Sequence, residues 1–183
     1  RDRSPSRGLG DVYKRQYKNF NRFIEAFSLL AQKDSKLYLI CTGNKFSQGE
    51  EDKLSKLHIK NKTLQINASD KELSELYTRA SLFVFPSLYE GFGIPILEAY
   101  ACHCPIAISN TSCFPEIAGD AAIYFDPYSV KDIANTIEAI IYNPQKANEL
   151  IQKGIKRLEL YSWEKTVVET EETYKKAIQG YNF

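Results

Sequence analysis

The 183-residue sequence contains no methionine, one tryptophan and two histidines. Because a complete reading frame starts at Met, we expect that part of the protein lies upstream of these residues. Four cysteines are too few for a disulfide framework in a chain of this length, which favours a reducing compartment. No apolar run approaches the roughly 18 residues of a membrane span, and no signal peptide is recognisable. The sequence therefore predicts a soluble segment.

The composition is that of a globular protein. Hydrophobic residues make up 43% of the chain, charged residues 26% and aromatic residues 13%. These proportions supply enough apolar side chains for a core and exclude a disordered, collagen-like or coiled-coil chain. At this length one domain is the default expectation, although two small domains would fit.

Residues 1–16 differ from the rest of the chain. They read RDRSPSRGLGDVYKRQ, without helical or strand periodicity, and contain five basic and two acidic side chains. A disordered basic tail is one interpretation. The segment from Ser6 to Gln16 also resembles the in-frame translation of a transposase adapter used in preparing sequencing libraries, so we predict an artefactual leader. Residues 17–183 then carry 19 basic and 21 acidic side chains, which removes the argument for a nucleic-acid partner.

From residue 17 onward, helical and strand periodicities alternate. The first helix is predicted to follow a capping Asn19, with apolar residues spaced three and four apart, and Ser69 with Glu72 forms a capping box for another. Further helices are predicted over 50–57, 95–102, 130–142, 145–158 and 162–179. Short apolar runs predict strands at Lys36–Cys41, Thr63–Asn67, Ser81–Phe85, Pro105–Ser109 and Ala122–Phe125.

Strands separated by helices predict right-handed β-α-β units and an α/β domain with one doubly wound, Rossmann-like parallel sheet. Ser81–Phe85 is nearly all apolar, as expected of a central strand covered on both faces. Ligands of such sheets bind outside the carboxyl ends of the strands. We therefore expect the functional residues at Thr42-Gly43, Asn67-Ala68, Ser87–Gly93 and Ser109-Asn110.

The most informative segment is PSLYEGFGIPILEA, which begins at Pro86. Glu90 lies in the loop after a strand, and Glu98 lies about one turn into the next predicted helix. Gly91 and Gly93 let the backbone approach a ligand closely, and free N–H groups at the helix start form an anion site. From these residues alone, a non-functional explanation is equally good: Glu90 would be an ordinary loop acid, and Glu98 a surface carboxylate favoured by the helix dipole.

This segment resembles the E-x7-E signature of the retaining family 4, or group 1, glycosyltransferases, which have the GT-B fold. The similarity continues over essentially all of residues 17–182. It includes Tyr17–Asn19, Ala107–Asn110, Pro115–Ala122, Phe125–Pro127 and Tyr161–Trp163. The resemblance implies that residues 17–183 are the C-terminal, nucleotide-sugar-binding half of such an enzyme, truncated at its N-terminal edge.

The resemblance also implies a role for each matching residue. Glu98 would bind the donor ribose, Glu90 would face the transferred sugar, and Lys18 would neutralise the leaving diphosphate. Gly91 and the backbone of Phe92, Gly93 and Ile94 would hold the sugar. The N–H groups of Ile96 and Leu97 would bind the distal phosphate. The base would lie near Ile66 and Asn67, and Gly43 would leave room for the donor.

Two positions depart from the family pattern. A Gly-Arg pair usually precedes the matching lysine, and the leader occupies that place; Arg15 belongs to the leader and is not assigned this role. His103 replaces the usual glycine, and we predict that it caps a helix at positive φ. Cys102-His103-Cys104 lacks the spacing of a zinc site, and no Asp-x-Asp motif is present, so we expect neither a metal nor another cofactor.

Three functions remain as hypotheses. The first is transfer of a sugar from a nucleotide diphosphate donor to an acceptor with retention, the acceptor being a sugar, lipid-linked or other glycan bound by an N-terminal domain. The second is a nucleotide-sugar-binding fragment without activity. The third is an epimerase, or a hydrolase that uses the two carboxylates. The resemblance implies a cytoplasmic location, with the whole protein associated peripherally with the inner face of a membrane.

Overall fold

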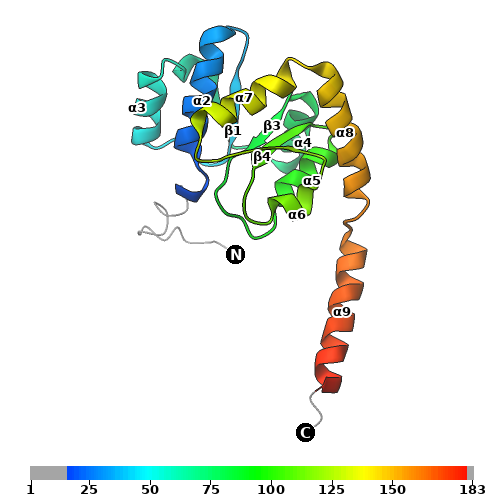
Figure 1. Ribbon diagram of the computed structural model, residues 1–183. Coiled ribbons are helices and arrows are strands. Elements are labelled where there is room, and N and C mark those ends of the chain that lie inside the picture. Colours follow the sequence, from blue (N-terminus) through cyan, green and yellow to red (C-terminus); the bar gives the residue numbers. More distant parts are fainter. Residues whose placement is uncertain (1–15, 181–183) are drawn as a thin grey trace.

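The computed structural model describes residues 16–180, so the leader predicted for residues 1–16 lies outside the described residues except for Gln16. Helices and strands alternate as expected (Figure 1). The strands are β1 (Leu39–Thr42), β2 (Thr63–Ile66), β3 (Phe83–Phe85), β4 (Ile106–Ser109) and β5 (Ile123–Phe125). The helices are α2 (Phe20–Lys33), α3 (Gln48–Lys56), η1 (Lys60–Lys62), α4 (Asp70–Arg79), α5 (Ile94–Ala101), α6 (Phe114–Ala118), α7 (Val130–Ile141), α8 (Pro144–Leu158) and α9 (Trp163–Gly180).

All paired strands are parallel, and they form two sheets where one was predicted. β1 pairs with β2, and β4 pairs with both β3 and β5. The six-strand Rossmann order is 3-2-1-4-5-6, in which strands 3-2 and 4-5-6 flank strand 1. β2 and β1 correspond to strands 3-2 of this order, and β3, β4 and β5 correspond to strands 4-5-6. Within residues 16–180 no strand takes the place of strand 1 between β1 and β3, so the sheet is not continuous.

β4 is the central strand of the larger sheet. All four of its residues are buried, whereas Phe83 and Val84 of β3 are partly exposed, so the predicted central position belongs to β4. Ile106 and Ile108 face one core cluster, and Ala107 faces the other. α4, α5 and α6 supply the first cluster, while α2 and α7, which pack closely together, supply the second. This arrangement holds the carboxyl end of β4 rigidly.

Local capping explains where several helices begin. Ser69 and Glu72 form the predicted capping box of α4. An unpredicted box, Ser47 with Glu50, starts α3 two residues before the predicted position. Asn19 precedes α2 as expected, but its side chain does not cap the helix. Its Nδ2 donates to the Pro127 carbonyl at 2.7 Å, which ties the start of α2 to the loop after β5.

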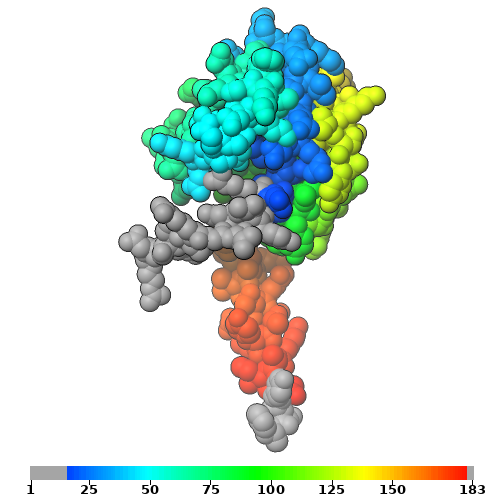
Figure 2. Space-filling view, turned by 90° about the vertical axis from the view of Figure 1, so that its left-hand side faces the viewer, coloured from blue at the N-terminus to red at the C-terminus, as the bar shows by residue number. Residues whose placement is uncertain are grey.

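α9 extends away from the rounded body (Figures 1 and 2). None of its residues is buried, and Trp163 is 75% exposed, so this tryptophan is not part of the core. No helix among the described residues has both the length and the apolar character needed to cross a membrane.

Candidate functional site

Glu90 lies in the loop between β3 and α5 and has two side-chain partners. The Ser87 hydroxyl, which is fully buried, donates to Glu90 Oε1 at 2.8 Å. Lys18 Nζ lies 2.6 Å from the same oxygen. The Glu90 side chain is 17% exposed and that of Lys18 is 47% exposed. The carboxylate is therefore held on one oxygen and sheltered, while the ammonium group remains accessible to a ligand.

The segment before α2 brings Lys18 to this loop. The Leu88 N–H donates to the Tyr17 carbonyl at 2.6 Å, which fixes the two segments side by side. Lys18 Nζ lies 5.4 Å from the centre of the Phe85 ring, at the carboxyl end of β3. An ion pair this accessible adds little to folding stability. The pair lies at the carboxyl end of a parallel strand, where ligands of such sheets bind.

Gly93 marks the start of α5. Its φ is 103°, a conformation that favours glycine, and an added Cβ would lie 3.1 Å from Ile96 Cδ1 and 3.5 Å from Phe114 Cε1. No side chain caps this helix start. The Ile96 N–H donates to the Gly93 carbonyl at 2.9 Å, so this predicted phosphate ligand already has an intramolecular acceptor.

Glu98 is the fifth residue of α5 and contacts the neighbouring helix α4. The Tyr77 hydroxyl donates to Glu98 Oε2 at 3.4 Å. Burial, together with the charge of Glu98, raises the pKa of Tyr77 well above its ordinary value. Tyr77 therefore stays protonated near neutral pH and can orient the carboxylate.

Of the loop residues predicted to hold a sugar, Gly91, Phe92 and Ile94 are accessible, whereas Gly93 is buried. Gly91 is exposed, with open space where a Cβ would be. Phe92 and Ile94 are 42% and 50% exposed, and the Phe92 ring stands edge-on to Tyr161 with centroids 6.0 Å apart. Leu97 is partly buried against the core behind α5. A ligand could reach the loop backbone without any rearrangement of the core.

The residues predicted to receive the base lie at the carboxyl ends of β1 and β2. Gly43 has a φ of 117° and open space around it, and its N–H donates to the Ile66 carbonyl at 3.1 Å. Asn67 is exposed. No hydrogen bond within residues 16–180 joins this group to the loop that holds Glu90. The structure thus brings the predicted residues together in two groups, each at the carboxyl ends of parallel strands.

Some side chains at the site were assigned no role from the sequence, although Ser87 lay within a predicted functional segment. Ser87 and Tyr77 contact the two glutamates directly, and Thr111–Cys113 contact the Glu90 loop from the segment after β4. The position of Thr111–Cys113, directly after a parallel strand, was a usable signal. Tyr77 carried none, because its contact with Glu98 depends on the packing of α4 against α5.

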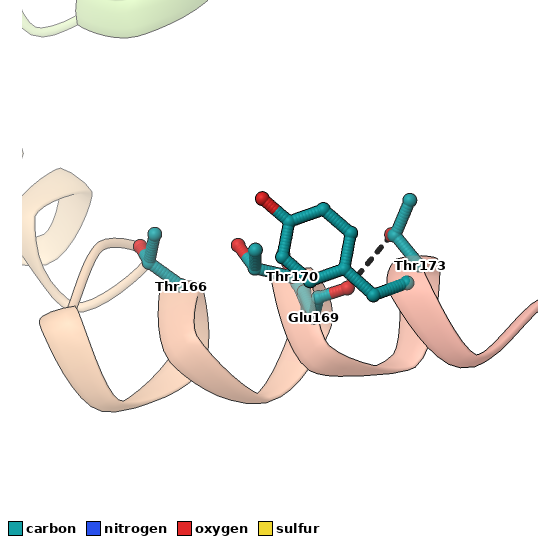
Figure 3. Close-up of a pocket in the computed structure, with 5 residues that line it drawn as sticks. Thr166, Glu169, Thr170 and Thr173 are labelled. Atoms are coloured by element: carbon teal, nitrogen blue, oxygen red, sulfur yellow. Dashed lines mark hydrogen bonds between the residues drawn. The ribbon is translucent and has the colours of Figure 1, made fainter. Parts of the chain in front are cut away.

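Neither histidine of the sequence lies in a ligand cluster. Within the described part of the chain, no group of three or more His, Cys, Asp or Glu side chains is arranged to hold a metal ion. A surface depression on α9 is lined by Thr166, Glu169, Thr170, Thr173 and Tyr174 (Figure 3). All five belong to one exposed helix, so this depression lacks the converging elements of a binding site.

The similar proteins of known sequence include mannosyltransferases. The chain is 38% identical over 106 residues to the O-antigen chain mannosyltransferase B of Escherichia coli. The matched stretch covers 58% of the chain and 28% of that protein. It is 29% identical over 169 residues to the serotype-specific mannosyltransferase WbdA of the same organism, which covers 89% of the chain and 21% of that protein. The chain thus spans less than a third of either relative.

Similar solved structures contain the same fold. Sucrose-phosphate synthase from Thermosynechococcus elongatus matches with a TM-score of 0.79 at 21% identity, over 90% of this chain and 43% of the synthase. The C-terminal domain of the Francisella tularensis group 1 glycosyltransferase LpcC matches with a TM-score of 0.70 at 23% identity. The match covers 79% of this chain and 80% of that domain. Anabaena Alr3699/HepE, solved with UDP and glucose, matches with a TM-score of 0.75 at 20% identity. The match covers 87% of this chain and 45% of that protein. The fold is therefore the Rossmann-like C-terminal half of a GT-B glycosyltransferase.

The family model described as "Glycosyl transferases group 1" matches residues 14–157. This stretch contains both glutamates, Lys18 and all five strands. The chain belongs to the group 1 glycosyltransferase family.

Proposed function

We propose that residues 17–183 form the donor-binding part of a retaining glycosyltransferase whose donor is a nucleotide diphosphate sugar. The observation that carries this proposal is the contact of 2.6 Å between Lys18 Nζ and Glu90 Oε1. It places a cation and a carboxylate side by side next to the uncapped start of α5, at the carboxyl end of a parallel strand. Breaking the bond between a sugar and a diphosphate needs a cation near the diphosphate and a carboxylate near the sugar.

Each of the two charges has a chemical task. As the bond between sugar and diphosphate breaks, negative charge grows on the diphosphate and positive charge on the anomeric carbon. The Lys18 ammonium stabilises the first, and the Glu90 carboxylate, oriented by Ser87, stabilises the second. With retention, the acceptor attacks the face from which the diphosphate leaves, and a donor phosphate oxygen takes its proton. The protein then acts mainly by positioning and charge.

The remaining residues bind the rest of the donor. Glu98, held by Tyr77, accepts hydrogen bonds from the ribose hydroxyls. The N–H of Leu97 at the start of α5 holds the distal phosphate, and that of Ile96 joins it on releasing the Gly93 carbonyl. Phe92, Gly93 and Ile94 hold the sugar. Gly43, Ile66 and Asn67 accommodate the base. No metal is required in this scheme, because Lys18 and the helix start supply the positive potential.

The names of the relatives make a mannosyl nucleotide the first donor to test. The acceptor would be a sugar or a lipid-linked glycan that contacts parts of the protein outside this chain. Because the chain spans only 28% and 21% of the first two relatives, we further propose that these residues alone bind the donor without transferring its sugar.

Calorimetric titration of the 183-residue chain tests the proposal. With guanosine, uridine and adenosine diphosphates and their sugar conjugates, we expect one base to be preferred. Glu98→Ala should weaken binding of that nucleoside diphosphate by about tenfold or more, because hydrogen bonds to a charged group contribute about 1.5–3 kcal/mol. Glu90→Ala should instead weaken binding of the sugar conjugate more than binding of the diphosphate.

Glu138→Ala is the matched control, since Glu138 is also ion-paired, to Lys33 at 3.1 Å, but belongs to α7. Its affinities should equal those of the unmodified chain. Absence of binding to every nucleotide, or unchanged affinities in both glutamate variants, would refute the proposal. Transfer by a longer protein that contains this chain, with and without Glu90→Ala, then tests the chemistry.

A further inference from the structure

Ser112, in the segment after β4, forms hydrogen bonds with both main-chain polar groups of Glu90. Its Oγ donates to the Glu90 carbonyl at 2.8 Å and accepts from the Glu90 N–H at 3.3 Å. One side chain therefore satisfies both backbone groups of the residue whose carboxylate faces Lys18. Neither group belongs to a helix or strand, so Ser112 replaces the partners that regular structure would provide.

The residues on either side of Ser112 extend this contact along the loop. The Thr111 hydroxyl donates to the Leu88 carbonyl at 3.3 Å. The Cys113 thiol lies 2.9 Å from the Phe92 carbonyl oxygen and 3.3 Å from that of Glu90, measured from Sγ, and can donate to either. Together with Ser112, three consecutive side chains hold carbonyls 88, 90 and 92 of the loop. We refer to Thr111–Cys113 as the clasp.

The backbone of Ser112 is strained, which argues that its side chain has a purpose. Its φ is 55°, in the left-handed region that costs a residue with a Cβ roughly 1–2 kcal/mol relative to the right-handed one. Glycine would adopt this conformation without that penalty. The two hydrogen bonds of Oγ offset the strain, and glycine could make neither. Serine at this position is therefore explained by its contact with Glu90.

The clasp and the ion pair act on different parts of Glu90. Ser87 and Lys18 hold the carboxylate, whereas Ser112 holds the main chain. The Glu90 carboxylate keeps its position only if both the carboxylate group and the main chain of the residue are fixed. Small displacements matter, because misplacing a reacting group by about 1 Å can lower a rate by about a hundredfold.

We propose that Ser112 is a positioning residue that sets the distance between the Glu90 loop and the donor sugar, with Thr111 and Cys113 completing the clasp. This inference rests on the proposed function, because it assumes that a sugar lies against residues 90–94. It predicts that the clasp controls recognition of the sugar and leaves recognition of the nucleotide to α5 and to the residues at the ends of β1 and β2.

The test compares Ser112→Gly with the unmodified 183-residue chain. Glycine keeps the left-handed backbone and removes Oγ. We expect binding of the nucleotide sugar to weaken about tenfold, as for loss of one well-formed hydrogen bond, while affinity for the nucleoside diphosphate changes less than twofold. Thermal stability should change little, because relief of the strain at φ 55° is opposed by the loss of the two Oγ hydrogen bonds.

Ser55→Ala is the matched control, because Ser55 Oγ also donates to a carbonyl, that of Glu51 at 2.9 Å, but on α3. It should change neither affinity. Cys113→Ser, which keeps a donor, should bind the nucleotide sugar better than Cys113→Ala.

Hydrogen exchange of the Glu90 amide supplies a readout that needs no ligand. It should speed up about tenfold or more in Ser112→Gly, because the acceptor of this N–H is lost. Unchanged exchange would overturn the clasp. Faster exchange with unchanged affinity for the nucleotide sugar would overturn the positioning role. Faster exchange in a chain that binds no nucleotide at all would overturn the proposed function and leave the clasp as a structural contact.

Discussion

His103 and His58 occupy the same position at the ends of two helices. His103 follows α5 with a φ of 57°, its N–H donates to the Tyr100 carbonyl at 3.0 Å, and the Cys104 N–H donates to the Ala99 carbonyl at 2.9 Å. This is the Schellman pattern, and it confirms the predicted positive φ at His103. His58 follows α3 with a φ of 56°, and the corresponding two bonds run from the N–H groups of His58 and Ile59 to the carbonyls of Ser55 and Leu54. Both imidazoles thus have a structural explanation.

Replacing His103 with glycine should stabilise the protein. Glycine adopts a φ of 57° without the steric penalty, although it loses more backbone entropy on folding. We expect the free energy of unfolding in urea, followed by circular dichroism, to rise by up to about 1 kcal/mol.

His58→Gly should give a change of the same sign, because its geometry is the same. His103→Val should lower stability, since a β-branched side chain tolerates this conformation least. A loss of stability in both glycine variants would contradict the explanation by backbone strain.

At the site, sequence reasoning identified residues that lie close together along the chain. Glu90, Gly93 and Glu98 fall within nine residues of a strand-loop-helix unit, and their positions follow from the strand end and the helix start. Lys18 was predicted from the family resemblance alone, because 72 residues separate it from Glu90. Ser112 was missed for the same physical reason: its contact with Glu90 is made only when β3 and β4 pair side by side.

At the scale of helices and strands, hydrophobic periodicity predicted the elements well and their ends less well. β1 begins at Leu39, not Lys36, because the Lys36 N–H donates to Asp34 Oδ1 in a turn after α2. α6 was not predicted, since its five residues are too few to show a helical period and Pro115 suggests a turn. α9 was predicted correctly as a helix, but periodicity says nothing about what covers it.

The packing of α8 against α5 depends on Gly154. This glycine is buried within α8, and a Cβ there would lie 2.4 Å from Cδ1 of Tyr100, which is itself buried. Gly154→Ala should therefore lower the free energy of unfolding by about 1–3 kcal/mol, as overpacking does, even though alanine has the higher helix propensity. Thermal and urea unfolding of the chain measure this change.

Gly49→Ala is the control for helix propensity. Gly49 lies in the first turn of α3 with open space where a Cβ would be. Without a clash, alanine should leave stability unchanged or raise it by up to about 1 kcal/mol. Equal effects of the two substitutions would mean that the contact between Gly154 and Tyr100 does not limit the packing of α8.

At the scale of the whole molecule, the alternation of strands and helices correctly predicted a parallel, Rossmann-like architecture. It did not predict two sheets: these have the order of the two strand groups that flank strand 1 in the Rossmann order, and no strand among residues 16–180 pairs between β1 and β3. The pattern of strand ends still located the site, since every parallel strand presents its carboxyl end to the same edge of its sheet.

Several groups that ionise in alkaline solution lie in the core cluster of α4, α5 and α6, and one, Cys41, lies in β1. Burial raises the pKa of Cys41, of Cys104 and of Tyr124 to about 12 in each case. Burial also raises the pKa of Tyr77 and of Tyr100. All five groups therefore favour the folded state while they are neutral.

We expect stability to fall as the pH rises above about 9. Each raised pKa contributes stability that is fully present below the unfolded-state value, near 9 for the thiols and 10 for the tyrosines, and is lost toward about 12. In that window the unfolded chain has released protons that the folded chain retains, so each group contributes a slope of up to about 1.4 kcal/mol per pH unit. Urea unfolding at pH values from 7 to 10.5 measures this slope, and Cys104→Ala should make it shallower by removing one group. A free energy of unfolding that stays constant between pH 8 and 10.5 would contradict the burial of these side chains, because a thiol or phenol that ionised equally in both states could not be enclosed in the core.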